Sequence, residues 1–197
     1  SAGIVPTTIE IMDQMTIQAV ENFLQIGLDT SKEAFVLLEV DGENWEVEQQ
    51  LEQVIGLCRE NGAVEIQVAH NEGERAALWK ARKSISGACG KMNPTKIGED
   101  IAVPPGNIPK MIQAVKEIAR KYDLNMVVFG HAGDGNLHPN IMTDKHNAAE
   151  MERVNQAIDE LFTRALELGG TLSGEHGIGF MKAPYVLQEL GQDGYRA

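Results

Sequence analysis

The chain lacks three features that would assign it to a membrane, secreted or nucleic-acid-binding class. No apolar run approaches the roughly 20 residues that a membrane-spanning helix needs. No early segment joins a basic start to an apolar middle, as a signal peptide does. Basic side chains are few: 17 Lys and Arg stand against 29 Asp and Glu, for a formal net charge of −12. Nucleic acid and anionic membrane are therefore poor partners, although a local cluster of cations could bind a small acid.

Cysteine is also scarce. Cys58 and Cys89 lie far apart and without the spacing of a metal site, so we expect two free thiols in a reducing cytoplasm. The remaining composition, 43% hydrophobic and 23% charged, is that of a globular protein with one or two subdomains. The chain starts at Ser1 without a Met and stops at Ala197 soon after its last motif, so we expect a domain excised from a longer protein.

The most informative stretch covers residues 126–142. Apolar residues 126–129 and 137–142 favour two strands, and Ala-Gly-Asp-Gly-Asn between them is typical of a turn. The stretch therefore predicts a β-hairpin. Side chains alternate along a strand, so His138 and Asn140 share a face, and His131 lies near His138 across the neck of the hairpin.

Two histidines placed in this way suit one divalent metal ion, Zn, Mn or Fe, and a carboxylate would complete a set of three ligands. Glu175 is the obvious carboxylate, because it lies in a second glycine-bracketed segment, residues 173–179. The alternative is that the histidines bond backbone carbonyls and the glycines only shape the hairpin. On spacing alone the alternative is favoured, since His-x6-His is a weak metal signal.

A helix predicted over Glu72–Ala88 carries an unusual stripe. Arg75, Trp79, Arg82 and Ser86 share one face. Basic side chains on such a face are usually solvated; a charged face that includes Trp could instead line a cleft.

The order of predicted elements indicates an α+β fold. Asp13 can cap the first helix, although Thr7-Thr8-Ile9-Glu10 also fits a capping box with an earlier start. The predicted strands are Thr8–Met12, Ala34–Val40, Ala63–Ala69, Thr95–Val103, the two hairpin strands and Thr171–Ser173. The other predicted helices are Asn44–Glu60, Glu72–Ala88, Asn107–Lys121 and Asn147–Leu168.

From Thr95 onward this order is βαββαβ, a ferredoxin-like unit. We therefore expect a degenerate first half at residues 1–90, a ferredoxin-like half at 91–182 and a tail without a clear anchor at 183–197. The two halves together would form an antiparallel sheet with helices on one face.

The two histidine segments also resemble a known family. Residues 130–140, Gly-His-Ala-Gly-Asp-Gly-Asn-Leu-His-Pro-Asn, and residues 173–179, Ser-Gly-Glu-His-Gly-Ile-Gly, are similar to the C-terminal half of FAD-linked 2-hydroxyacid oxidoreductases, which are flavoproteins of the vanillyl-alcohol oxidase type. The resemblance is best to the glycolate oxidase large subunit and D-lactate dehydrogenases. Residues 3–6, 10–13, 78–82 and 99–104 match in the same order, so the resemblance covers nearly the whole chain and reverses the preference against a metal site.

The resemblance implies an FAD-dependent enzyme that oxidises a 2-hydroxy acid to a 2-oxo acid, with this chain as its substrate-binding cap domain. FAD would be bound mainly by an N-terminal half that this chain lacks. His131, His138 and Glu175 would hold the divalent metal, and His176 would be the base that takes the hydroxyl proton.

The resemblance also implies a carboxylate clamp. Arg82 and Ser86 match the residues with which the family grips the substrate carboxylate. Some relatives add a Lys where this chain has Gly98, so Lys96 is only a nearby substitute. Asn140 would hydrogen-bond the substrate or orient the site.

Partners would be the 2-hydroxy acid, the FAD-binding domain of the same protein and electron-transfer subunits of a glycolate oxidase complex. The location would be cytoplasmic, with peripheral attachment to the inner membrane through partner subunits as the alternative. Two other functions remain open: the same domain type serves a flavin-dependent transferase that makes ether-lipid precursors, and the hairpin could belong to a non-catalytic module that binds metal or a small acid.

Overall fold

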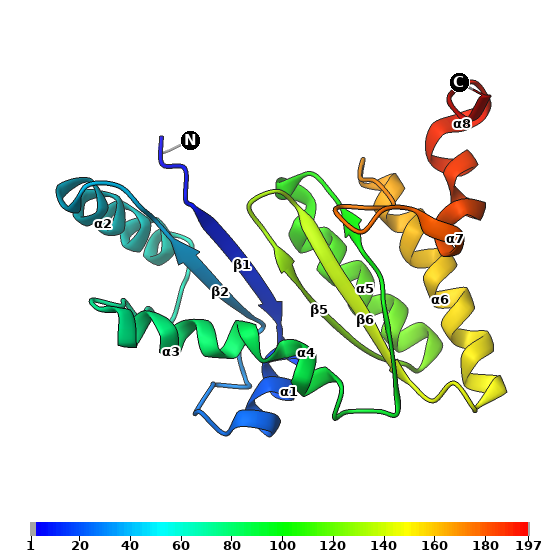
Figure 1. Ribbon diagram of the computed structural model, residues 1–197, viewed down its shortest axis with the longest axis horizontal. Coiled ribbons are helices and arrows are strands. Elements are labelled where there is room, and N and C mark those ends of the chain that lie inside the picture. The colour runs from blue at the N-terminus through cyan, green and yellow to red at the C-terminus, as the bar shows by residue number, and fades with distance from the viewer. Residues whose placement is uncertain (1–2, 197) are drawn as a thin grey trace.

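The computed structural model describes residues 3–196 and builds them around one antiparallel sheet (Figure 1). The strands lie in the order β2-β1-β5-β6-β3. β3 pairs with the second half of β6, and β4 pairs with the first two residues of β6. The α+β class with an antiparallel sheet is therefore confirmed. The strands are β1 Thr8–Asp13, β2 Ala34–Glu39, β3 Thr95–Gly98, β4 Ile101–Ala102, β5 Asn125–His131 and β6 Asn136–Thr143.

The second part of the chain has the ferredoxin-like order. The unit begins with β3 and β4, which are followed by α5 (Ile108–Tyr122), the β5–β6 hairpin and α6 (Ala148–Glu167). In the sheet, β6 lies between β5 and β3. Two predicted strands are shorter than expected. Thr95–Val103 is split into β3 and β4 at Glu99 and Asp100, and Thr171–Ser173 is reduced to a single bridge between Thr171 and Ala102.

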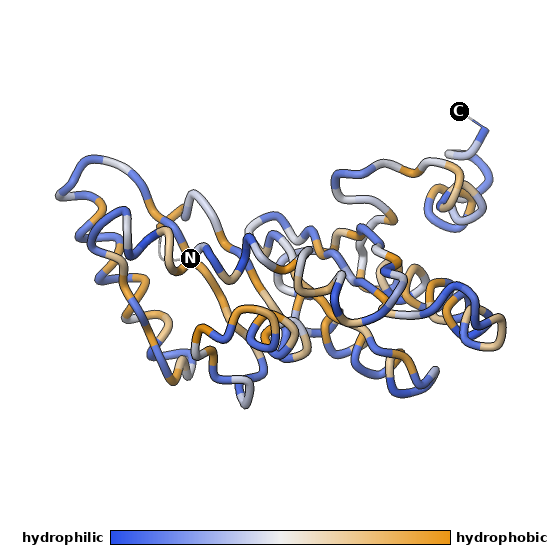
Figure 2. The backbone as a smooth tube through the Cα atoms, turned by 60° about the horizontal axis from the view of Figure 1, so that its bottom comes forward, coloured by the Kyte–Doolittle hydropathy of each residue, from blue (hydrophilic) through white to orange (hydrophobic). Residues whose placement is uncertain are grey.

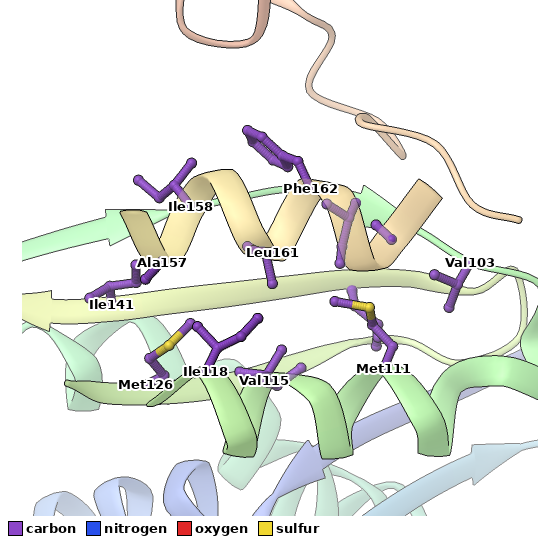
Figure 3. Packing of buried hydrophobic residues seen from close by; sticks show 14 of the residues in the cluster. Val103, Met111, Val115, Ile118, Met126, Ile141, Ala157, Ile158, Leu161 and Phe162 are labelled. Carbon is purple, nitrogen blue, oxygen red and sulfur yellow. The ribbon is translucent and has the colours of Figure 1, made fainter. Parts of the chain in front are cut away.

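The larger core lies between α5, α6 and one face of the sheet (Figure 3). Pro109 in the first turn of α5 costs that helix no backbone bond, because the first N–H groups of a helix have no intrahelical partner. Burying one large apolar side chain completely stabilises the fold by about 1.5–3 kcal/mol. The side chains labelled in Figure 3 are Val103, Met111, Val115, Ile118, Met126, Ile141, Ala157, Ile158, Leu161 and Phe162.

A second core covers the opposite face. It joins α1 (Gln14–Leu24), the end of α3 (Glu72–Lys83) and α4 (Ile85–Cys89) to Met12, Val127 and Met142 of the sheet. Every residue of β6 is consequently buried. Helices therefore cover both faces of the sheet, and the expectation that they lie on one face is wrong. The division of the chain near residue 90 stays a prediction, since β1 pairs directly with β5.

The start of α1 is where Asp13 predicts it. Asp13 Oδ1 accepts hydrogen bonds from the Thr16 N–H at 2.9 Å and from the Val128 N–H at 3.1 Å, so the cap also ties the helix to β5. The competing start at Thr7 is wrong, because the residues that follow it pair as β1.

Two predictions for the first part of the chain are wrong. Ala63–Ala69 alternates like a strand but pairs with no other strand of the described chain, and Val64 is left 75% exposed. The predicted helix Glu72–Ala88 breaks at Ser84, whose N–H bonds the carbonyls of Ala81 and Arg82. Between β2 and α3, α2 (Asn44–Glu60) has no buried residue.

The C-terminal segment is anchored, contrary to expectation. It contains α7 (Gly179–Lys182), a 3-10 turn and α8 (Val186–Arg196), and it projects away from the sheet (Figures 1 and 2). Lys182 is buried and donates to the Asp100 carbonyl at 2.5 Å. Glu189 accepts from the Thr171 hydroxyl at 2.5 Å. Across residues 3–196, no helix has the length and apolar character to cross a bilayer. Cys58 and Cys89 are free thiols, as predicted.

Candidate functional site

The histidine site lies on the sheet face that carries the second core. Glu10 on β1 pairs with His131 on β5, and His138 on β6 pairs with Phe129. Strand alternation puts these side chains on the same face as Met12, Val127 and Met142. The two predicted histidines therefore point to one face, because the turn at residues 132–135 keeps β5 and β6 in register.

The structure brings His131, His138 and Glu175 together. Candidate ligand atoms of the three residues all lie within 4.8 Å of one another. Glu175 Oε1 is 3.4 Å from His138 Nε2 and 4.0 Å from His131 Nε2, and the two imidazole rings meet edge to face at 5.4 Å. These residues come from two strands and from the loop after residue 172. That they hold a metal ion stays a prediction.

Each of the two imidazoles has a carboxylate behind it. His131 Nδ1 lies 2.7 Å from Glu10 Oε1, and His138 Nδ1 lies 3.8 Å from Asp100 Oδ1. Nδ1 of His138 and Oδ1 of Asp100 are both buried without a hydrogen-bond partner. A carboxylate at Nδ1 favours the tautomer whose Nε2 lone pair is free, which is the arrangement of metal-binding histidines. Burial also lowers the pKa of His138, so the neutral form that ligates is favoured.

Asp100 fixes the loop that carries Glu175. Its Oδ2 accepts the backbone N–H groups of Gly174, Glu175 and His176 at 3.0, 3.0 and 2.8 Å, and the Ser173 hydroxyl at 2.9 Å. Burial would raise the pKa of Asp100, but these donors outweigh it and the pKa is lowered. A β-carbon at Gly174 would stand 2.3 Å from the side chain of Asn136, so any larger residue there would have to displace that buried amide.

His176 is placed differently from the other two histidines. Its side chain is 61% exposed, its Nε2 lies 3.4 Å from Glu175 Oε1, and its ring stacks on His138 at 5.4 Å. Asp100, His138 and His176 form a second group with ligand spacing. Two of its three members, Asp100 and His138, are buried, so this group is less open to a substrate than the group of His131, His138 and Glu175.

The residues of the predicted carboxylate clamp make two separate contacts, and their role as a clamp stays a prediction. Arg82 at the end of α3 donates from Nε to Glu10 Oε2 at 2.6 Å and lies over the Phe129 ring at 5.2 Å. Ser86 and Lys96 meet each other, since Lys96 Nζ donates to the Ser86 hydroxyl at 3.3 Å. The break at Ser84 puts Arg82 and Ser86 on separate helices. Among residues 3–196, Lys96 makes no hydrogen bond or ion pair with the histidines of the site.

The rest of the stripe and Asn140 have other partners. Arg75 and Trp79 both donate to Glu39 on β2 at 2.8 Å, so they belong to the edge of the sheet. Asn140 shares the face of His138, as predicted, but its amide donates to the His138 carbonyl at 2.9 Å. A β-carbon at Gly98 would stand 2.8 Å from the Asn140 side-chain oxygen.

Sequence reasoning missed Glu10, Asp100 and Lys182. The stretches at residues 10–13 and 99–104 stood out, but nothing in them indicated that a carboxylate would back a histidine. Lys182 lies over the Phe162 ring, and burial lowers the pKa of its ammonium group. Burial raises the pKa of the neighbouring Glu99 carboxyl. A buried Lys next to two buried carboxylates has no signal in spacing, because these residues meet only through the tertiary fold.

Comparison with known proteins gives a consistent result. A family model described as "FAD linked oxidases, C-terminal domain" matches residues 1–197. The chain is 47% identical over its whole length to glycolate oxidase subunit GlcD of Bacillus subtilis, and covers 42% of that protein. It is 32% identical over 97% of its length to GlcD of Escherichia coli K12, and covers 38% of it. A probable mitochondrial D-lactate dehydrogenase of Danio rerio is 31% identical over 96% of the chain, which covers 38% of that protein. The chain thus spans less than half of these relatives.

Two solved structures have the same fold. p-Cresol methylhydroxylase with substrate bound matches with a TM-score of 0.57 and 12% identity, over 83% of this chain and 38% of that one. A 4-ethylphenol oxidase from Gulosibacter chungangensis, in its isoeugenol complex, matches with a TM-score of 0.59 and 14% identity, over 92% and 42%. At such identities the likeness concerns the fold alone.

Proposed function

This chain belongs to the family of FAD-linked oxidase C-terminal domains, and from that premise we propose that it is the substrate-binding and catalytic cap domain of an FAD-dependent 2-hydroxyacid dehydrogenase or oxidase. The names of its relatives favour glycolate or D-lactate as the substrate type. The reaction converts the 2-hydroxy acid to a 2-oxo acid.

One observation carries the proposal. Two imidazoles present Nε2 to the same carboxylate oxygen of Glu175, and each has a carboxylate facing its Nδ1. This donor set of two nitrogens and one oxygen suits Zn, Mn or Fe and leaves positions for a substrate. Nδ1 of His138 and Oδ1 of Asp100 are buried, have no other partner and lie 3.8 Å apart, so Asp100 is placed to orient the His138 ring with its Nε2 toward Glu175. A divalent metal held by His131, His138 and Glu175 would supply Lewis-acid polarisation of the substrate hydroxyl.

The residues of the chain supply the remaining requirements. Arg82 would hold the substrate carboxylate with its terminal nitrogens, because its Nε is already used by Glu10. Ser86 and Lys96, which already contact each other, would add polar donors to that clamp. Asn140 would orient the site through its bond to the His138 carbonyl.

His176 would be the general base of the reaction. Its exposed Nε2 stands beside Glu175 and above His138, so it can take the hydroxyl proton of a substrate next to the three ligands. FAD, held mainly by the rest of the protein, would supply the acceptor for the α-hydrogen and its electron pair, and the side chains named here would not take part in that transfer.

Partners and a location follow from this function. The FAD-binding part of the full-length protein would cover the exposed side of the site, and electron-transfer subunits would receive the electrons, in keeping with relatives that are named as subunits. A cytoplasmic location is supported by the two free thiols.

The experiment compares 2-hydroxy acids with the matching 1,2-diols, in which CH2OH replaces the carboxylate, as substrates of the full-length protein. We expect oxidation of the acids and not of the diols. Arg82→Lys should raise KM for the acids about 10- to 100-fold, the loss of one charge-assisted hydrogen bond of about 1.5–3 kcal/mol. Arg75→Lys, on the same helix but bound to Glu39, is the matched control. Equal rates for acids and diols would overturn the proposal.

A further inference from the structure

Glu10 is a buried carboxylate with two different partners. It is 5% exposed, and its oxygens are divided: Oε1 lies 2.7 Å from His131 Nδ1, and Oε2 accepts from Arg82 Nε at 2.6 Å. Cross-strand pairing of Glu10 with His131 fixes the first contact, and the last turn of α3 brings in the second. One side chain thus joins a predicted metal ligand to the predicted anion-binding arginine.

We propose that Glu10 is a positioning residue that couples the metal site to the carboxylate clamp. The inference rests on the proposed function, because it takes His131 as a ligand and Arg82 as the group that binds the substrate carboxylate. Glu10 keeps the His131 proton on Nδ1, so Nε2 faces the ion, and it keeps Arg82 Nε occupied, so the terminal nitrogens face the substrate.

The coupling has a definite sign. A cation at His131 Nε2 makes the Nδ1–H a stronger donor, which strengthens its bond to Glu10. The charge of Glu10 is then drawn toward His131 and neutralises Arg82 less. A substrate carboxylate should therefore bind more tightly when the cation is present, and by reciprocity the cation should bind more tightly when the carboxylate is present.

The chemistry of an amide gives a sharp test. A glutamine at this position has one acceptor oxygen and an NH2 group that only donates. His131 and Arg82 lie on different oxygens of Glu10, so in this geometry the amide oxygen can accept from only one of them, and the NH2 group would oppose the other partner. In the full-length enzyme, Glu10→Gln should weaken Zn²⁺ binding about 10- to 100-fold. The affinity is measured by competition with a chelator, in the absence of substrate. KM for the 2-hydroxy acid should rise as well.

A second substitution separates positioning from a general structural role. In Glu10→Gln with Arg82→Leu, the amide oxygen no longer has to serve the arginine and is free for His131. Zn²⁺ affinity should then recover above that of Glu10→Gln alone, while KM stays high. A loss of stability alone gives no such recovery.

The matched control is Glu39→Gln. Glu39 is a carboxylate on the neighbouring strand that accepts from Arg75 and Trp79 and has no histidine partner. It should leave Zn²⁺ affinity and KM unchanged. If Glu10→Gln does not fold, Glu10→Asp keeps the charge but is one methylene too short to span both partners, and it should lose Zn²⁺ affinity while circular dichroism shows the native fold.

The outcomes are distinguishable. Wild-type Zn²⁺ affinity and KM in a folded Glu10→Gln or Glu10→Asp enzyme overturn the coupling and leave the proposed function standing. Weak Zn²⁺ binding by wild-type enzyme, or no oxidation of any 2-hydroxy acid, overturns the proposed function itself. Weakened Zn²⁺ binding without recovery in the double variant overturns the assignment of Glu10 as the link to Arg82.

Discussion

At the scale of single residues, the three histidines of the site have different surroundings and so should fail separately. His138 is 8% exposed and faces Asp100 with Nδ1, whereas the His176 side chain is 61% exposed and its Nε2 lies 3.4 Å from Glu175 Oε1. In the full-length enzyme, His138→Ala should abolish metal retention and activity together. His176→Ala should keep the metal and lower kcat about 10²–10⁴-fold, the usual cost of losing a general base.

Metal content by atomic spectroscopy after desalting, together with kcat, checks this division. If His176→Ala loses its metal as completely as His138→Ala does, His176 is a ligand. The group formed by Asp100, His138 and His176 would then be the metal site.

Asp13 allows a prediction about stability and pH. Burial raises its pKa above the ordinary 3.8, although Thr16 and Val128 donate to it. Because the native carboxyl binds its proton more tightly than the unfolded one, its contribution to stability is greatest below pH 3.8 and is lost as the pH rises through the raised native pKa. Asp13→Asn keeps one acceptor oxygen and does not titrate. Its free energy of unfolding, relative to that of wild type, should therefore increase as the pH rises from 3.8 through the raised pKa of Asp13.

Asp13→Ala should behave differently. It removes the cap of α1 and leaves the buried Val128 N–H without an acceptor, at a cost of about 1–3 kcal/mol at any pH. Urea unfolding of the three proteins at pH 4 and pH 7 makes the comparison. Equal losses in the Ala and Asn variants would show that the bond to Val128 contributes nothing.

At the scale of elements, the β5–β6 hairpin depends on one glycine. Gly135 has φ +85°, and a β-carbon there would stand 1.9 Å from the Val103 carbonyl oxygen. Gly135→Ala should therefore distort the turn, lower stability by at least about 1–3 kcal/mol and weaken Zn²⁺ binding, because His131 and His138 flank the loop. Gly133→Ala in the same loop is the control, since its β-carbon would meet Ile9 at an ordinary 3.9 Å. Thermal unfolding and Zn²⁺ titration of both variants decide the matter, and equal behaviour would contradict the role given to Gly135.

The elements that sequence predicts well are those with a local cause. Alternation and turn glycines predicted the hairpin, and the side chain of Asp13 predicted the start of α1. The break of the helix at Ser84 was not predicted. The strand predicted at Ala63–Ala69 is absent because a strand needs a neighbouring strand with a free edge as well as an alternating pattern. Within the site, the convergence of His131 and His138 follows from strand period. The contacts of Glu10 with His131 and of Asp100 with the His176 N–H do not follow from strand period, because 121 and 76 residues separate the two members of each pair.

At the scale of the whole molecule, the two helical layers bury both faces of β6 and leave the site at the border of the second layer. This arrangement predicts that flavin lies against the domain and not inside it. Three successive backbone N–H groups, those of Gly174, Glu175 and His176, form the kind of concave cluster that binds phosphate in other proteins, but here Asp100 Oδ2 fills it. The cluster is therefore closed to a pyrophosphate.

Purified protein of residues 1–197 should accordingly be colourless and should not oxidise glycolate or D-lactate, yet it should bind Zn²⁺ through His138. An absorption spectrum after gel filtration and a Zn²⁺ titration of wild type and His138→Ala test both statements. A flavin band that elutes with the protein would contradict the first, because it would require a phosphate cradle that the filled cluster cannot provide. Zn²⁺ binding that survives His138→Ala unchanged would contradict the second, because the two strands of the hairpin would then not be what holds the ion.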